Sequence, residues 1–196
     1  MTIETLTLPE IRNVYNHRMI YDFPPDELKS LSLIENLLKK GQYICYGMKN
    51  GKDLLAYAFF VIMGNHYLFD YFAVREDLRG TGIGSRFLQE LCVNRMKDAA
   101  SVILEVDDPA AADSAEEKAV RDRRLRFYMK NGLRDTGARA RTFGVDFLLL
   151  ELPVGKPLIM EAAGQIYSRI YCSILPKRIW TRMVQILNVP RAEEKA

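Results

Sequence analysis

The sequence predicts an α/β protein built on a mixed β-sheet. Two helical segments come first, and from Gln42 the pattern changes to three strand-like segments joined by short turns. A glycine-rich loop, a helix and a further strand follow, which is the order of a βαβ unit. We therefore expect a central sheet that combines an antiparallel meander with a βαβ unit, flanked by helices, and a helical extension at the C-terminus.

The N-terminal part of the chain predicts two helices. Thr7-Leu8-Pro9-Glu10 has the spacing of a capping box with a proline in the first turn, so a helix is expected from there to about Met19. Pro24 and Pro25 then prevent helix continuation. Leucine and isoleucine recur at helical spacing up to Gly41, which is expected to end the second helix.

Three strands are expected next, at residues 43–48, 54–63 and 67–74, where aromatic and β-branched residues dominate. Asn50-Gly51 is a strong hairpin signal between the first two. Because short turns can join only antiparallel neighbours, the three segments predict a meander.

The second half of the chain alternates helices and strands. A helix is expected from about Gly82 to Lys97, a strand parallel to the third one at residues 101–106, and a helix that begins with a capping box at Ser114 and Glu117 and ends at Asn131-Gly132. Further strands are expected at residues 133–139 and 142–152. After residue 157 the chain is expected to be helical, with a break near Pro176. We assign residues 1–153 to the main domain and 154–196 to an extension that packs on that domain or on a partner subunit.

Composition excludes several classes of function. The formal net charge of +3 is too small to indicate a nucleic-acid partner, and its excess lies in the last 42 residues, with seven Lys and Arg against three Asp and Glu. Cys45, Cys92 and Cys172 have no metal-ligand spacing, and the chain has only two histidines, so we expect no metal and no disulfide framework. The longest apolar run, residues 54–63, is too short to span a bilayer, and no signal peptide is apparent. A cytoplasmic protein is expected.

Arg79-Gly80-Thr81-Gly82-Ile83-Gly84 lies between an expected strand and an expected helix. Alternating glycines let a backbone approach a ligand closely, and the helix start adds unpaired N–H groups and a positive dipole end, which together suit a pyrophosphate. A P-loop would need Gly-Lys-Ser/Thr, and a dinucleotide fingerprint has a different glycine spacing. A tight turn without a ligand is the remaining alternative.

The loop closely resembles the acyl-CoA loop of the GNAT N-acyltransferase superfamily, whose pattern is Arg/Gln-x-x-Gly-x-Gly/Ala after a strand. Residues 104–107, Leu-Glu-Val-Asp, resemble the next strand of that family, and residues 127–133, Phe-Tyr-Met-Lys-Asn-Gly-Leu, resemble the end of its following helix. The resemblance covers about three quarters of the chain. The asparagine that many relatives place after the Glu-Val strand is absent here, and the tail after Leu152 exceeds the family core.

The resemblance implies direct acetyl transfer from acetyl-CoA, as co-substrate, to an amine. It assigns donor binding to Arg79 and the loop backbone, and pantetheine binding to the strand before the loop, with the Phe72 amide polarising the thioester. The implied donor-binding residues are Phe72, Ala73, Val74, Arg79, Gly80, Thr81, Gly82, Ile83, Gly84 and Ser85. The resemblance also assigns Tyr128 to the position near the CoA sulfur. A tyrosine has a pKa of about 10, so it could protonate a leaving thiolate; a core aromatic is the alternative.

The proton acceptor is harder to assign. Strand alternation places Leu68, Asp70, Phe72 and Val74 on one face, and Asp70 is the acid in this apolar strand. Because relatives in the family often carry their base on this strand face, Asp70 is the candidate base. The equal alternative is a carboxylate that is satisfied by a neighbouring strand or loop, or one that only binds the charge of the amine. Glu105 is a second candidate, but we expect it to face solvent.

The resemblance implies that the loop between the first two helices helps to line the acceptor site. Because this loop carries acidic and aromatic residues, we expect a small cationic amine rather than a protein amine as the acceptor. These residues are Tyr21, Asp22, Phe23, Asp26 and Glu27. Two other functions remain open from the sequence. One is an acyl-CoA sensor without turnover, and the other is an interaction module that uses the basic tail. The apolar stripes of the tail favour packing on the domain or in a homodimer over membrane binding.

Overall fold

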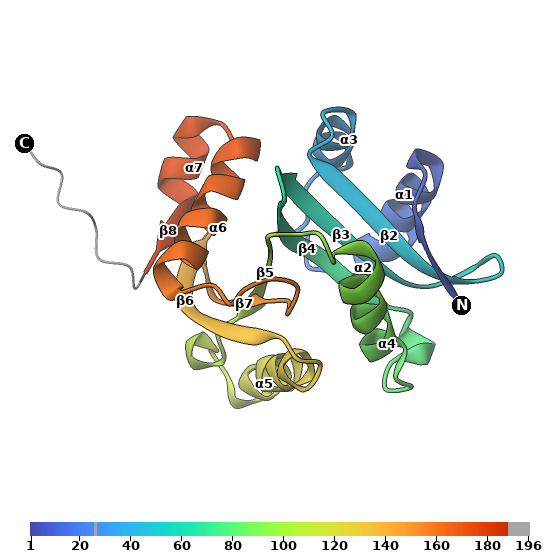
Figure 1. Ribbon diagram of the computed structural model, residues 1–196. Helices are drawn as coiled ribbons and strands as arrows, with labels where there is room; N and C mark the ends of the chain where they lie inside the picture. The colour runs from blue at the N-terminus through green and yellow to red at the C-terminus, as the bar shows by residue number, and fades with distance from the viewer. Residues whose placement is uncertain (26, 188–196) are drawn as a thin grey trace, which may run out of the picture. The chain divides into compact units, whose positions relative to one another are not determined.

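The computed structural model describes residues 1–25 and 27–187, so Asp26 of the acceptor loop lies outside the described residues. The chain forms two compact units, one from Met1 to Lys97 and one that begins at Asp98. Each unit contains four strands and its own helices (Figure 1). The predicted parallel pairing of the third strand with residues 101–106 joins the two units and stays a prediction.

The first unit begins with a short strand that the sequence analysis missed, β1 (Thr2–Thr5), which pairs with β2. The first helix follows as α1 (Leu8–Val14), a π-helical turn (Tyr15–Met19) and α2 (Ile20–Asp22). The predicted capping residues hold its start, because the Thr7 N–H donates to the Glu10 carboxylate at 2.8 Å. The second predicted helix is α3 (Leu31–Lys39), and Gly41 after it has a φ of +68°, as a helix-ending glycine requires.

The predicted meander is present. Strands β2 (Tyr43–Asn50), β3 (Asp53–Met63) and β4 (His66–Val74) pair antiparallel in that order. The hairpin between β2 and β3 turns at Gly51, whose φ is +60°. A 3-10 turn (Glu76–Leu78) then leads to the glycine loop, α4 (Ile83–Glu90) and a π-helical turn (Leu91–Arg95).

The second unit contains β5 (Ser101–Asp107), a 3-10 turn (Pro109–Ala111), α5 (Ala115–Lys130), β6 (Arg134–Thr142) and β7 (Val145–Glu151). Strand β7 pairs antiparallel with both β5 and β6. The hairpin between β6 and β7 turns at Phe143-Gly144, later than the break expected after Arg139. Both turn residues have positive φ values, +50° and +89°, and the phenylalanine gave no turn signal in the sequence.

The C-terminal segment is attached to the second unit. It forms α6 (Met160–Ile174), α7 (Lys177–Met183) and a strand that the sequence analysis missed, β8 (Val184–Ile186), which pairs with β6. The helix break near Pro176 is confirmed. The apolar stripe of α6 is buried, including Tyr167, Ile170 and Tyr171, so this stripe packs inside the protein.

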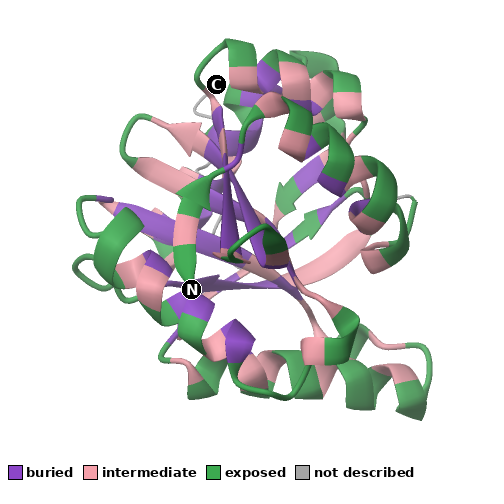
Figure 2. Ribbon diagram, turned by 90° about the vertical axis from the view of Figure 1, so that its right-hand side faces the viewer, coloured by how far each residue is buried: buried purple, intermediate pink, exposed green. Residues whose placement is uncertain are grey.

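The core of each unit lies on its strands. Figure 2 shows that strands are largely buried, whereas most helices have one buried and one exposed side. Strand β3 is buried from Leu55 to Val61. Within residues 1–25 and 27–187, no helix has the length and apolar composition needed to cross a bilayer.

The start of α5 gives a test of these local signals. The Ser114 hydroxyl accepts the Glu117 N–H at 3.0 Å, and the Glu117 carboxylate accepts the Asp113 N–H at 2.8 Å. Ser114→Ala should lower the free energy of unfolding by about 1 kcal/mol, because the helix loses its cap. Thermal denaturation should show a melting temperature lower by about 2 to 4 °C. Ser114→Asp, which keeps a capping acceptor, should lose much less; equal losses in both variants would contradict the capping role.

Candidate active site

The glycine loop has the backbone geometry of an anion cradle. Gly80 and Gly82 have φ values of +79° and +89°, which side chains other than glycine rarely adopt. A Cβ atom added at either position would meet no atom within 4 Å, so the space beside both residues is open. Gly82 is also the N-cap of α4 and has no side chain to occupy the first N–H groups of the helix. The loop therefore offers backbone donors and a helix dipole to an anion.

Arg79 stands at the entrance of this loop, as predicted, and its side chain is 54% exposed. Its Nε donates to the Val74 carbonyl at 3.2 Å, and its Nη2 donates to Asp22 Oδ1 at 2.9 Å. The arginine is thus held against the end of β4 and the end of α2. A pyrophosphate at the loop would compete with Asp22 for this guanidinium, or would use the donors that Asp22 leaves open.

Asp22 connects the loop with other charged side chains. It accepts a hydrogen bond from the Tyr57 hydroxyl at 2.8 Å and lies 3.5 Å from Arg18 Nε. The Arg18 guanidinium also lies 5.4 Å from the centre of the Tyr57 ring. Burial and the charge of Asp22 raise the pKa of Tyr57 far above its usual range, so this hydroxyl remains a donor. The sequence analysis missed Arg18, because its helical position carried no signal of this contact.

Strand β4 contains Asp70, Phe72, Ala73 and Val74, but it does not alternate regularly. The pairing with β3 shifts between Phe59 and Phe60, which face Tyr71 and Phe69 in turn, so Asp70 is the extra residue of a β-bulge. The expectation that Leu68, Asp70, Phe72 and Val74 share one face by strict alternation is therefore wrong at the bulge. Bulges of this kind often lie beside active sites, where they change the direction of a side chain.

The Asp70 carboxylate is buried in an ion pair. Its side chain is 2% exposed, Lys29 Nζ lies 2.5 Å from Oδ1, and the Tyr43 hydroxyl donates to Oδ2. Burial and the Asp70 charge raise the pKa of Tyr43 well above its usual range. Lys29 comes from the segment between α2 and α3, which Tyr71 also holds by accepting the Lys29 N–H at 2.8 Å. Proton transfer to Asp70 would have to occur beside the Lys29 charge.

Tyr128 lies in the last part of α5 and is 7% exposed. Burial raises its pKa to about 12, with Arg124 lowering it and Asp107 of β5 raising it to smaller extents. Within the described part of the chain, its hydroxyl makes no hydrogen bond with another side chain. Tyr128 therefore carries a proton at neutral pH.

Glu105 is not the solvent-facing residue that the sequence led us to expect. It is half-buried on β5, and two buried tyrosines of α6 donate hydrogen bonds to its carboxylate. Nothing in the strand pattern of residues 101–107 could have shown this, because the donors, Tyr167 and Tyr171, lie more than sixty residues further along the chain.

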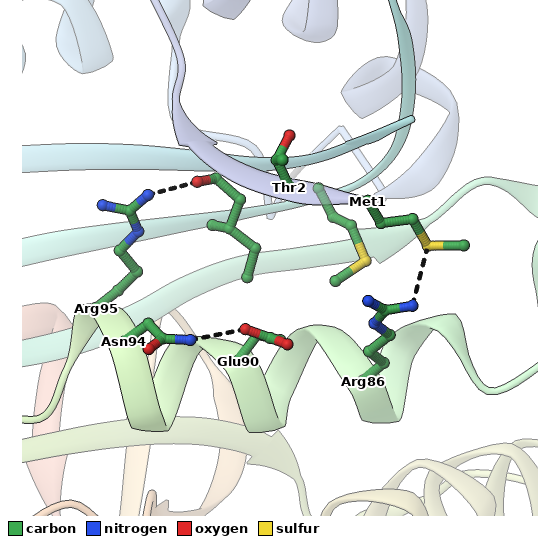
Figure 3. A pocket seen from close by; sticks show the side chains of 8 residues that line it. Met1, Thr2, Arg86, Glu90, Asn94 and Arg95 are labelled. Carbon is green, nitrogen blue, oxygen red and sulfur yellow. Dashed lines mark hydrogen bonds between the residues drawn. The ribbon is translucent and has the colours of Figure 1, made fainter. Parts of the chain in front are cut away.

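A separate cavity of about 240 Å³ lies between β1 and α4 with its following turn (Figure 3). Arg95 of this turn donates to the Ile3 carbonyl of β1 at 2.5 Å, whereas Asn94 donates to Glu90 within the same helical segment at 2.7 Å. None of the predicted site residues lines this cavity. Among residues 1–25 and 27–187, no cluster of three or more His, Cys, Asp or Glu side chains could hold a metal ion.

Comparison with known proteins decides the family. Residues 8–130, more than half of the chain, match the model of the acetyltransferase (GNAT) family. This chain belongs to the GNAT acetyltransferase family. It is an acyltransferase with the α/β fold that the sequence predicted. The relative YjbC of Bacillus subtilis (strain 168), whose name describes an acetyltransferase, is 29% identical over 160 residues, which are 76% of this chain and 77% of YjbC.

Solved structures of GNAT proteins share the fold. A GNAT-family protein from Bacteroides thetaiotaomicron has a TM-score of 0.66 at 20% identity, with 90% of this chain and all of that chain covered. The ribosomal-protein-S18-alanine N-acetyltransferase of Escherichia coli has a TM-score of 0.53 at 18% identity and coverages of 79% and 94%. A GNAT acetyltransferase from Elizabethkingia anophelis, solved with acetyl-CoA bound, has a TM-score of 0.52 at 17% identity and coverages of 77% and 96%.

The raised pKa of Tyr128 predicts a specific effect at high pH. The unfolded state loses the Tyr128 proton near pH 10, whereas the folded state keeps it until about pH 12. The stabilisation from this residue is therefore complete below pH 10 and is lost as the pH rises from about 10 to about 12. Tyr128→Phe should reduce this alkaline loss by about 2 kcal/mol, measured by denaturant unfolding across that range. The matched change at exposed Tyr21, Tyr21→Phe, should leave the loss as in the native chain, and equal curves for all three proteins would contradict the assignment.

Proposed function

We propose that this protein transfers an acetyl group from acetyl-CoA to a primary amine by direct attack of the amine on the thioester. The observation that carries the proposal is the loop at Gly80 and Gly82, where left-handed backbone, open space and an uncapped helix start coincide. The loop resembles the acyl-CoA loop of the family, and the related Elizabethkingia anophelis enzyme was solved with acetyl-CoA bound.

In this proposal, the donor binds to the loop and to the end of β4. The backbone N–H groups from Gly80 to Ser85 and the Arg79 guanidinium hold the pyrophosphate, while Phe72, Ala73 and Val74 contact the pantetheine arm. Phe72 polarises the thioester carbonyl through its amide, which would stabilise the charge that develops on the oxygen.

Tyr128 is proposed as the acid. The amine nitrogen forms a bond with the carbonyl carbon, the carbon–sulfur bond breaks, and the sulfur takes the Tyr128 proton. A pKa of about 12 keeps the hydroxyl protonated until a thiolate appears beside it, and its lack of a partner among the described residues leaves it available.

Two carboxylates are proposed as candidates for the proton acceptor. Asp70 is the sequence-based candidate, but its carboxylate is buried and already held in an ion pair with Lys29. Glu105 accepts hydrogen bonds from two tyrosine hydroxyls of α6, which fix the orientation of its carboxylate. We therefore favour Glu105, and Asp70 then serves to hold Lys29 and the segment between α2 and α3.

The acceptor is proposed to be a small cationic amine rather than a protein amine, with the reaction taking place in the cytoplasm. Of the acidic residues in the acceptor loop, Asp22 is already paired with Arg79, and Asp70 on the adjacent strand is paired with Lys29. The Escherichia coli relative is named for a ribosomal-protein alanine acceptor, and a peptide with N-terminal alanine belongs in the same test.

Donor binding can be tested with two matched glycine variants. Gly82→Ala and Gly51→Ala both place a Cβ on left-handed backbone with no atom within 4 Å, so each should cost about 1 kcal/mol of stability. Saturating acetyl-CoA at about a hundred times its Kd should raise the melting temperature of the native chain by roughly 5 to 10 °C. Gly51→Ala should keep this shift and Gly82→Ala should lose most of it. No shift in the native chain, or equal shifts in both variants, would overturn the donor site.

Turnover can be tested by thiol release from acetyl-CoA with spermine, kanamycin, a neutral amine and a peptide that begins with alanine. The two polycations should react fastest, and faster reaction of the neutral amine or the peptide would overturn the acceptor proposal.

Tyr128→Phe should lower kcat on the order of a hundredfold without reducing the acetyl-CoA melting shift. Glu105→Gln should lower kcat by a similar factor and Asp70→Asn by less; the reverse order would identify Asp70 as the base. Binding without turnover of any amine would indicate a sensor.

A further inference from the structure

The carboxylate of Glu105 is fixed by two tyrosine hydroxyl groups of the second unit. Tyr171 donates to Oε1 at 2.9 Å and to Oε2 at 3.1 Å, and Tyr167 donates to Oε1. The Tyr167 and Thr142 oxygens are 2.5 Å apart. Because the single Tyr167 proton goes to Glu105, Thr142 must be the donor in that contact. The hydroxyls thus form a directed chain from Thr142 to Tyr167 to Glu105.

The two tyrosines leave little freedom in this arrangement. They are four residues apart on α6, so their rings project from one face of the helix, with centroids 5.0 Å apart at an angle of 61°. Tyr167 is completely buried and Tyr171 is 3% exposed. Burial, followed by the Glu105 charge, raises the pKa of Tyr167 well above its usual range, so it stays a donor at any working pH.

The cluster lies beside the proposed acid. Asp107, two residues after Glu105 on β5, forms an ion pair with Arg124 of α5 and is close enough to Tyr128 to affect its pKa. Strand β5 therefore contains Glu105 and also lies next to the Tyr128 hydroxyl. A partly buried carboxyl group is weak evidence for stability, since apolar residues of similar size often pack equally well. Apolar residues could attach α6 to β5 equally well, so the attachment of this helix does not explain why position 105 is a carboxylate.

We propose that Tyr167 and Tyr171 are positioning residues that hold Glu105 as the proton acceptor for the attacking amine, so that α6 is part of the catalytic unit. The inference rests on the proposed acetyl transfer. As the amine nitrogen bonds to the carbonyl carbon and the carbon–sulfur bond breaks, a nitrogen-bound proton passes to Glu105 and the sulfur takes the Tyr128 proton. Exchange with solvent then returns one proton from Glu105 and restores one to Tyr128, so the enzyme is unchanged over the cycle.

The first test is Tyr171→Phe, which removes the hydroxyl and keeps the ring. With the fastest of the four amines as acceptor, kcat should fall about tenfold or more. The acidic limb of the pH profile of kcat/KM should also move to higher pH, because a carboxylate that loses a donor binds its proton more tightly. Tyr46→Phe is the control, since Tyr46 is a buried tyrosine of the first unit whose hydroxyl makes no hydrogen bond in the described structure. A fall in kcat with an unmoved acidic limb would show a merely structural role and overturn the proposal.

A second measurement does not depend on turnover. Carbon NMR of glutamate-labelled protein, with the Glu105 signal assigned by its absence in Glu105→Gln, should show a higher pKa for Glu105 in Tyr171→Phe than in the native chain. Tyr167→Phe should act in the same direction and replaces Tyr171→Phe if that variant does not fold. An unchanged Glu105 pKa in both variants would overturn the inference.

The acetyl-CoA melting shift should persist in both variants. If the native chain shows no shift and no thiol release, acetyl transfer itself fails, and this result is distinguishable from an active enzyme that is indifferent to the tyrosines.

Discussion

The donor site depends on the left-handed backbone at Gly80 and Gly82. A residue with a Cβ at such φ values would cost about 1 to 2 kcal/mol at each position, and its side chain would project into space that is now open. The two glycines turn the chain from the end of β4 into the first turn of α4 and leave the N–H groups of that turn uncapped. Arg79 is then held at the loop entrance by the last carbonyl of β4 and by Asp22.

Features that depend on local sequence were predictable. The capping residues Thr7 and Ser114, the glycine at position 51 and the glycine loop each act over a few residues, and the helices and strands that they delimit are present with small boundary shifts. The missed strands, β1 and β8, have only four and three residues, too few for a period to be visible. They become strands because an edge of β2 or β6 is available for pairing.

The charged site residues were less predictable, because their partners are distant in the sequence. Asp70 and Lys29 are separated by 41 residues, Asp22 and Arg79 by 57, and Glu105 and Tyr171 by 66. Burying a carboxylate without partners would cost several kcal/mol of folding free energy. Each of these acids accordingly contacts a cation or hydroxyl donors. Alternation along β4 could place Asp70 in an apolar strand, but it could show neither the bulge nor the lysine. A buried acid needs partners whether it is catalytic or structural. The presence of partners therefore does not show which role the acid has.

The type of partner separates the candidate acids. A lysine or arginine at a carboxylate favours its charged form through a full opposite charge, which falls off slowly with distance and opposes proton uptake. A tyrosine hydroxyl is neutral and directional, so it fixes the orientation of a carboxylate with less resistance to its protonation. Asp22 and Asp70 are paired with cations, and Glu105 accepts hydrogen bonds from the hydroxyls of α6. The family match ends at residue 130, and these hydroxyls come from residues 167 and 171. The segment beyond the family core thus supplies the hydroxyl groups that orient Glu105.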